Sequence, residues 1–209
     1  MKTFKIRCSA ISKILPPNEK DDALSKGVIT YLEDWYAESL GNDYEDVQTK
    51  YTLKGHLCED EHIFLLGEKL GIFGMKKNEV YYDTHEYIHG TPDVVEKDFI
   101  ADVKCSWNLK TFYKSVMSKR NYDYFCQLQG YMILTNKNKA ILSYALLDTP
   151  EESNYGKYIS YSHIPFENRN YQDTFDLDLD FESRLTNKVK QCREYLNDYD
   201  LKLKSKLKK

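Results

Sequence analysis

The residue types best suited to chemistry lie in the middle of the chain, in Gly90-Thr-Pro-Asp93 and, further along, in Asp102-Val-Lys104. Side chains alternate between the two faces of a β-strand, so a strand through the second segment places Asp102 and Lys104 on one side. The opposite face of this strand is apolar, with Phe99, Ala101, Val103 and Cys105. If the intervening residues turn back as a hairpin, Asp93 comes to lie beside Asp102 on the neighbouring strand.

This arrangement of charges suggests a metal site. Two carboxylates a few ångströms apart repel each other, and each then favours its protonated form. A divalent cation removes that conflict, and carboxylate oxygens are ligands that Mg²⁺ and Mn²⁺ prefer. Lys104 would stand next to the metal, where it can orient an attacking water or help to deprotonate it, as phosphodiester hydrolysis requires. The plain alternative is a surface salt bridge, worth at most about 1 kcal/mol.

A third carboxylate is predicted on a helix over about residues 54–70. Glu59, Ile63, Leu66 and Leu70 follow the spacing of one helix face. A carboxylate on an otherwise apolar face needs a partner, because burying its charge alone is costly. Glu59, in the pattern Gly55-x-x-x-Glu59, is therefore a candidate for the same metal site. The alternative is an ordinary glutamate paired with a lysine.

A second helix, over about residues 122–135, carries polar groups on its inner face. Gln127 and Tyr131 share this face, and Gly130 would allow a close approach to a neighbouring element. The two polar side chains could contact a phosphate or brace the lysine. A buried glutamine satisfied within the protein explains the same pattern.

These residues need a layered scaffold to bring them together. Helices are expected over about 23–40, 54–70 and 122–135 and again at the C-terminus, with two or three antiparallel strands within 79–107 and further strands over 139–147 and 158–164. The basic residues of 107–120 fit either a DNA path or a solvated loop. The order of elements predicts an α+β (α/β) fold, with a central mixed β-sheet flanked by helices.

Composition limits the class of protein. The 209 residues fit one domain over 1–209, with an N-terminal helical part (about 1–53) and a C-terminal helix and basic tail (about 181–209). Five scattered cysteines without a CxxC pair predict reduced thiols, and no apolar run approaches the roughly 20 residues of a membrane span. We expect a cytoplasmic protein without a membrane partner. The chain has no GxxxxGK[ST] loop for ATP and no HExxH zinc motif.

Taken together, four motifs resemble those of the PD-(D/E)xK nuclease superfamily, and most closely its RecB-like and lambda-exonuclease (YqaJ) branches. They are Gly55-x-x-x-Glu59, Gly90-Thr-Pro-Asp93, Asp102-x-Lys104 and Gln127-x-x-x-Tyr131. The resemblance implies a restriction-endonuclease-like core. It also implies that Asp93, Asp102 and the backbone carbonyl of Val103 hold one or two Mg²⁺ or Mn²⁺ ions. Glu59 would bind the metal directly, through water or through a second ion, and Lys104 would serve the water nucleophile.

On the substrate side, the resemblance assigns Gln127 and Tyr131 to a DNA-facing helix. Arg7 and Ser9, in Arg7-Cys-Ser9, are similar to an early motif that contacts the terminal 5′ phosphate in phage exonucleases. The departure from the family pattern is Asp102, where these branches more often have glutamate.

The function implied is that of a Mg²⁺-dependent DNA exonuclease, acting 5′→3′ on duplex ends in phage-type recombination or DNA processing. The expected partners are DNA, a single-strand annealing protein and further copies of the chain in a ring, in the host cytoplasm if the protein is phage-encoded. Two alternatives stay open: a DNA endonuclease of the same fold, and a DNA-binding recombination accessory protein without catalysis.

Overall fold

We describe a computed structural model that places residues 2–17, 23–41 and 48–208. Its centre is a four-stranded mixed sheet in the order β3-β4-β5-β6. The strands are β3 (Val94–Val95), β4 (Ile100–Cys105), β5 (Lys139–Ala145) and β6 (Asn170–Asp176). β4 and β5 run parallel, whereas both outer strands are antiparallel to their neighbours. A second, small sheet pairs β1 (Ile6–Arg7) with β2 (Ile88–His89) in parallel.

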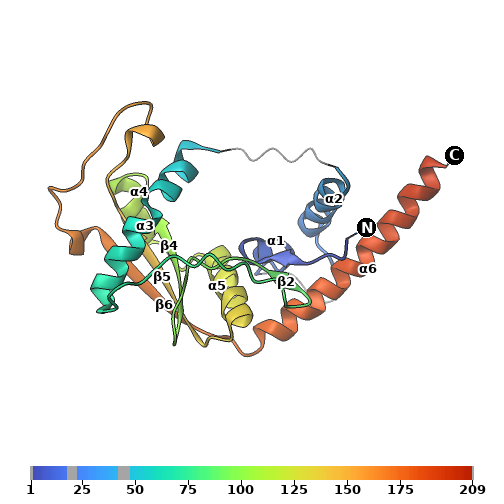
Figure 1. Ribbon diagram of the computed structural model, residues 1–209. Helices are drawn as coiled ribbons and strands as arrows, with labels where there is room; N and C mark the ends of the chain where they lie inside the picture. The colour runs from blue at the N-terminus through green and yellow to red at the C-terminus, as the bar shows by residue number, and fades with distance from the viewer. Residues whose placement is uncertain (1, 18–22, 42–47, 209) are drawn as a thin grey trace.

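Helices surround the central sheet (Figure 1). The α-helices are α1 (Ile11–Ile14), α2 (Lys26–Leu40), α3 (Lys50–Leu70), α4 (Leu109–Met117), α5 (Tyr122–Thr135) and α6 (Phe181–Leu207). Short 3₁₀ helices are η1 (Cys8–Ala10), η2 (Glu151–Ser153) and η3 (Phe166–Asn168). Among the residues that the structure describes, no helix is both long and apolar enough to cross a bilayer.

Two helices cover opposite faces of the sheet (Figure 1). One face of β4 presents Ala101 and Val103 to α3, which packs its buried Ile63 and Leu66 there. The other face carries Ile100, which joins a larger cluster with residues of α5. The alternation along β4 that the sequence predicted is confirmed: odd-numbered side chains face α3 and even-numbered ones face α5. The expected α/β fold with a mixed central sheet is confirmed.

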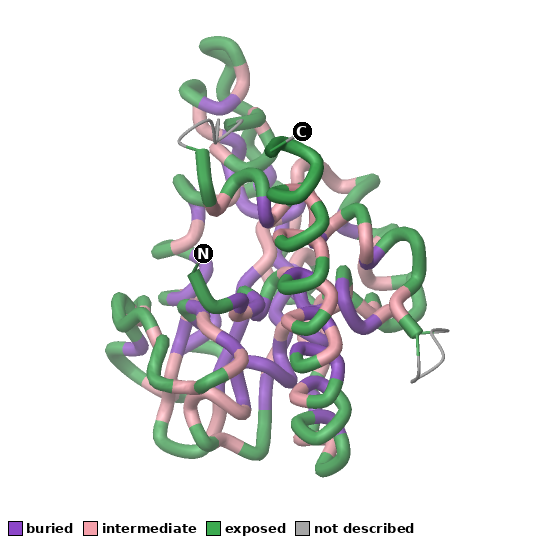
Figure 2. The backbone as a smooth tube through the Cα atoms, turned by 90° about the vertical axis from the view of Figure 1, so that its right-hand side faces the viewer, coloured by how far each residue is buried: buried purple, intermediate pink, exposed green. Residues whose placement is uncertain are grey.

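The larger hydrophobic cluster runs well beyond the sheet. It takes in Phe4 near the N-terminus, Leu32 of α2 and Leu196 of α6, all of them buried. The hydroxyl of Tyr36 donates to Asp200 at 2.5 Å, which ties α2 to α6. The last turns of α6 leave this core and are mostly exposed (Figure 2). One core shared by both ends of the chain supports the proposal of a single domain.

The predicted strand over 158–164 is wrong. That segment makes only one isolated bridge, between Ile159 and Thr149. The Asp148 carboxylate shapes it as a loop, because it accepts hydrogen bonds from the Tyr158 hydroxyl at 2.5 Å and the Tyr161 N–H at 2.6 Å. The fourth strand is β6, in a polar stretch without a strand-like hydrophobic pattern. An edge strand tolerates such polar residues, because one of its sides stays open to solvent.

Two further boundaries differ from the expectation. The residues after β4 form a helix, α4, where the sequence predicted a basic loop or a DNA path. Asn108 and Thr111 form a capping box at its start, and Phe112 packs it into the core. α3 begins at Lys50, one turn earlier than expected, because Thr49 and Thr52 form a capping box. The N-terminal part predicted to be helical also contains the strand β1. Its residues 18–22 and 42–47 lie outside the described residues.

Gly130 lets α5 approach the N-terminal segment closely. A methyl group built on Gly130 would lie 2.5 Å from Ile11 Cδ1 and 2.9 Å from Cys8 Sγ. The predicted close approach is therefore confirmed, and the neighbours are η1 and α1.

We expect Gly130→Ala to destabilise the protein by roughly 1–3 kcal/mol, because the added methyl overpacks a buried contact. Gly55→Ala is the matched control. It is also a glycine within a helix, but an added methyl meets nothing within 4 Å, so it should raise stability by up to about 1 kcal/mol through helix propensity. Urea unfolding measures both variants. Equal effects of the same sign would contradict the packing described here.

Candidate active site

Asp102 and Lys104 emerge from β4 on the same face, as predicted. Asp102 is buried, with 1% of its surface exposed, and its Oδ2 forms an ion pair with the Lys104 ammonium. Its other oxygen, Oδ1, accepts a hydrogen bond from Gln127 Nε2 of α5 at 2.9 Å. A buried carboxylate is costly unless both oxygens are satisfied. Here one lysine and one amide together hold the charge in place.

Asp93 lies directly before β3, next to Asp102. Its Oδ2 accepts a hydrogen bond from the backbone N–H of Val103 at 2.8 Å. Burial, and then the negative charge of Asp102, raise the pKa of Asp93 to about 7, although Lys104 and the Val103 N–H act in the opposite direction. The two carboxylates therefore repel each other, as the sequence predicted, and the pair is short of positive charge.

The charge of Lys104 is firmly held. Burial on its own would lower the pKa of Lys104, but the nearby carboxylates of Asp102 and Asp93 outweigh it and raise that pKa above its ordinary value. The ammonium also lies 5.4 Å from the ring centroid of Tyr124. In the metal-free protein Lys104 is a fixed cation, and it has little tendency to give up its proton.

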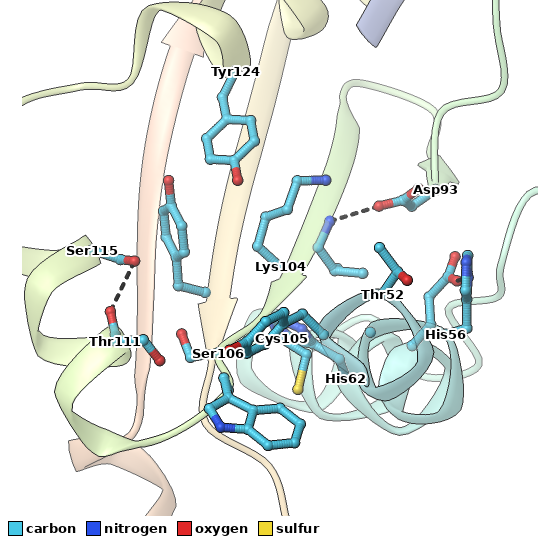
Figure 3. Close-up of a pocket in the computed structure, with 16 residues that line it drawn as sticks. Thr52, His56, His62, Asp93, Lys104, Cys105, Ser106, Thr111, Ser115 and Tyr124 are labelled. Carbon is cyan, nitrogen blue, oxygen red and sulfur yellow. Dashed lines mark hydrogen bonds and ion pairs between the residues drawn. The ribbon is translucent and has the colours of Figure 1, made fainter. Parts of the chain in front are cut away.

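These residues border a pocket of about 540 Å³, drawn in Figure 3. Asp93 and Lys104 both line it, and the helices α3, α4 and α5 supply its walls. The remaining lining residues are Tyr51, Thr52, Gly55, His56, Glu59, His62, Val103, Cys105, Ser106, Trp107, Thr111, Ser115, Tyr124 and Tyr144. The pocket therefore opens where β4 and β5 end, beside the charged cluster.

Glu59 points to this pocket, as the helix pattern predicted. Its side chain is 15% exposed, and Oε2 lies 3.0 Å from the Lys77 ammonium and 3.9 Å from His56 Nδ1. The negative charge of Glu59 contributes to the raised pKa of Asp93, so the two carboxylates interact electrostatically. Lys77, however, is the group that Glu59 contacts in this structure.

Gln127 and Tyr131 stand behind Asp102, and neither lines the pocket. Gln127 Nε2 contacts the Tyr131 hydroxyl at 3.2 Å as well as Asp102. Tyr131 is buried, and burial, followed by the charge of Asp102, raises its pKa. The pair braces an aspartate, where the sequence had suggested a phosphate or the lysine.

Arg7 and Ser9 do not line the pocket, and both are exposed. The residue between them, Cys8, is buried against Gly90 and Gly130. Arg7 pairs in register with His89 on β2, four residues before Asp93. The structure thus ties this early motif to the segment that leads into the site, without placing it in the pocket.

The donor atoms beside the pocket fit a hard divalent cation. Asp93 and Asp102 offer carboxylate oxygens, and the family resemblance implies the backbone carbonyl of Val103 as a further ligand. The raised pKa of Asp93 indicates a local shortage of positive charge. Within 2–17, 23–41 and 48–208, no three histidine, cysteine, aspartate or glutamate side chains form a group ready to hold a metal. The fit therefore rests on two carboxylates and a carbonyl.

The sequence reasoning missed two residues that bear on the site: His62, which lines the pocket, and Lys77, which contacts Glu59. His62 is buried, its Nε2 lies 2.9 Å from Ser143 Oγ, and burial followed by the charge of Lys104 lowers its pKa to about 3. It shares the helix face of Glu59, three residues along, so the same periodicity could have selected it. Lys77 lies in a loop, where no periodic pattern marks it.

The fold is restriction-endonuclease-like, with helices on both faces of a mixed sheet. Among the solved proteins that share it are two exonucleases. The phage-related exonuclease from Haemophilus somnus 129PT superposes with a TM-score of 0.85 at 24% identity, over 97% of each chain. The alkaline exonuclease LHK-Exo from Laribacter hongkongensis, also solved in complex with dAMP, superposes with a TM-score of 0.72 at 14% identity, over 97% of this chain and 93% of its own.

No protein-family model matches the sequence, and no curated protein matches it. The likeness predicted from four short motifs is therefore confirmed at the level of the fold, by structures of low sequence identity.

We expect the metal-free protein to lose stability as the pH rises. The pKa of Asp93 is raised to about 7 in the folded chain, against about 3.9 when unfolded. The stability from its protonation is thus present below about pH 4 and is lost as the pH rises through about 7. Asp93→Asn stays neutral and can still accept from Val103, so it should not show this loss.

Urea unfolding in EDTA between about pH 5 and pH 8.5 measures the effect. The stability of Asp93→Asn relative to the unaltered protein should grow toward high pH. A difference that does not change with pH would show that the pKa of Asp93 is not raised in the folded protein.

Proposed function

We propose that the protein is a metal-dependent deoxyribonuclease that digests DNA from its ends. The observation that carries this proposal is the juxtaposition of Asp93, Asp102 and Lys104 at one edge of a pocket. It occurs in a fold that two solved exonucleases share. The dAMP complex of LHK-Exo adds support, because a deoxyribonucleoside monophosphate is a product of DNA hydrolysis.

Asp93, Asp102 and the Val103 carbonyl would hold one or two Mg²⁺ or Mn²⁺ ions. Such a metal, when bound, polarises a phosphoryl oxygen and lowers the pKa of a bound water. Glu59 would join the site by giving up its ion pair with Lys77 and binding the metal instead. The chain's own contribution is to keep two carboxylates adjacent and partly desolvated.

Lys104 would act as a cation. Its raised pKa disfavours the role of proton acceptor in the metal-free protein, so we assign it to orienting the attacking water or the phosphate. Gln127 would act through Asp102, which it holds by a hydrogen bond at 2.9 Å. Tyr131 would in turn fix Gln127.

The finer features of the predicted function are part of the same proposal. They are 5′→3′ digestion of duplex ends, contact of Arg7 and Ser9 with a terminal phosphate, a ring of identical chains, a single-strand annealing partner and a role in recombination. A cytoplasmic location belongs with them. For the proposed phosphate contact, the support is that Cys8, between Arg7 and Ser9, packs against Gly90 of the segment that leads to Asp93.

Lys104→Ala should reduce the hydrolysis of linear duplex DNA in Mg²⁺ by a factor of roughly 10² to 10³ or more, because it removes charge positioned at the reacting phosphate. Lys137→Ala is the matched control, since this lysine only donates to the carbonyl of Lys97 at the surface. Release of acid-soluble nucleotides measures the rate. Circular DNA that is cut as fast as linear DNA would favour an endonuclease.

Full hydrolysis by Lys104→Ala would place the chemistry elsewhere. Binding of DNA ends by the unaltered protein without any cleavage in Mg²⁺ or Mn²⁺ would favour the accessory protein. Contaminating nuclease is excluded by purifying the Lys104→Ala and unaltered proteins in parallel.

Asp102→Asn should abolish both hydrolysis and stabilisation by metal, because it removes a ligand charge. The unaltered protein should unfold at a higher temperature as Mn²⁺ is added, since a ligand that binds only the folded state stabilises it. Thermal unfolding with and without EDTA measures this shift. A shift of the same size in Asp102→Asn would place the metal at another site.

A further inference from the structure

Beside the pocket, a lysine and three aromatic side chains form a cluster that the proposed chemistry does not use. The aromatic cluster consists of Lys50, Tyr51, Trp107 and Tyr155. The ammonium of Lys50 lies 5.3, 5.1 and 5.9 Å from the ring centroids of Tyr51, Trp107 and Tyr155. Tyr51 and Trp107 contact each other edge to face, with centroids 5.2 Å apart at 80°.

The cluster is continuous with the candidate active site. Tyr51 and Trp107 line the same pocket as Asp93 and Lys104. Trp107 follows Lys104 by only three residues, directly after β4 ends, and Tyr51 stands in the first turn of α3. A molecule that reaches the charged residues with one part would therefore meet the aromatic rings with another.

A buried lysine, Lys54, contacts the Trp107 part of this cluster. Lys54 is fully buried, and its ammonium donates to the carbonyls of Trp107 at 3.1 Å and Leu147 at 2.9 Å and to Thr149 Oγ1 at 2.8 Å. It also lies 5.8 Å from the Trp107 ring centroid. Lys54 thus holds the backbone of Trp107 in place, and its ammonium also lies near the ring of that residue.

The contacts of Lys54 do not explain the two tyrosines. Tyr51 is 57% exposed and Tyr155 is 86% exposed, so neither buries much apolar surface. Tyr155 also adopts a left-handed backbone conformation, with φ of 54°. That conformation disfavours tyrosine and suits glycine or asparagine. The fold alone would select a small polar residue there, and an aromatic ring kept at such a position points to a ligand.

Flat aromatic faces beside a cation suit a nucleobase that is linked to a phosphate. A base in a duplex exposes only its edges, because both of its faces are stacked, whereas an unpaired base offers a face to an aromatic side chain. Lys50 supplies positive charge among the rings, where the phosphate of such a nucleotide would pass. Stacking on these rings therefore requires an unpaired base.

We propose that the aromatic cluster stacks on an unpaired nucleobase of the DNA strand whose phosphate enters the pocket. This inference rests on the proposed function and deepens it.

The chain offers an optical probe for this contact. Its only tryptophans are Trp35 and Trp107, and Trp35 packs against Phe4, with ring centroids 4.8 Å apart. In a Trp35→Phe protein, the emission of Trp107 should be quenched when a single-stranded oligothymidylate binds. Measurements in EDTA and again with Ca²⁺ follow binding without Mg²⁺-supported cleavage. An oligonucleotide that carries abasic sites should bind with roughly 5- to 150-fold lower affinity, the range for loss of one base–aromatic stack.

Tyr155→Asn separates binding from folding. Asparagine tolerates the left-handed conformation, so urea unfolding should show equal or greater stability, while affinity for the oligonucleotide falls about 5-fold or more. Phe73→Ala is the control. Phe73 is equally exposed, at 86%, but lies beyond the far end of α3. Trp107→Phe should keep most of the affinity and Trp107→Ala should lose it.

The inference is overturned if normal and abasic oligonucleotides bind equally, if Trp107 is not quenched, or if the oligonucleotide does not bind at all in either condition. Its failure differs from failure of the proposed function. A protein that degrades DNA with unchanged kinetics and affinity in Tyr155→Asn is a nuclease without this subsite. A protein that stacks bases but never cuts them keeps the subsite and loses the proposed activity.

Discussion

The buried negative charge of Asp102 is the constraint on which the rest of the site depends. A carboxylate 1% exposed is tolerated only with its oxygens engaged, and here Lys104 and Gln127 engage them. Lys104 can do so because it leaves β4 on the same face, and Gln127 because α5 packs on that face. The contacts of the Asp102 carboxylate thus join β4 to α5, in addition to the hydrophobic contacts between them.

Asp93 adds a second carboxylate beside the pair of Asp102 and Lys104. The Val103 N–H donates a hydrogen bond to the carboxylate of Asp93 and holds it beside that of Asp102. Burial and the charge of Asp102 raise the pKa of Asp93. Lys104 offsets only part of the excess negative charge. Glu59 adds more, but Lys77 neutralises it in the structure described here. The carboxylates of Asp93 and Asp102 therefore repel each other, and a divalent cation would relieve this repulsion. This electrostatic requirement links the fold to the proposed activity.

The sequence revealed the parts of the site that repeat with a strand or helix period. Alternation found Asp102 and Lys104, and helix spacing found Glu59 and the face of Gln127. Contacts made by loops were hidden, because a loop leaves no period: Lys77 against Glu59 is the clearest case. Strand β6 was missed for another reason, since its polar edge gives no hydrophobic signal. Apolar residues near Tyr158 suggested a strand instead, but Asp148 folds them into a loop.

Cys8, Gly90 and Gly130 meet at one point, although they come from three distant parts of the chain. A methyl group on Gly90 would lie 3.4 Å from Cys8 Cβ, and one on Gly130 would lie 3.3 Å from the same atom. Tyr131 Cε1 lies closer still to the first position, at 2.9 Å, and Ile11 Cδ1 to the second, at 2.5 Å. Among homologous sequences the volumes of these five residues should therefore covary, which would couple the evolution of the N-terminal segment to that of the two motifs it contacts.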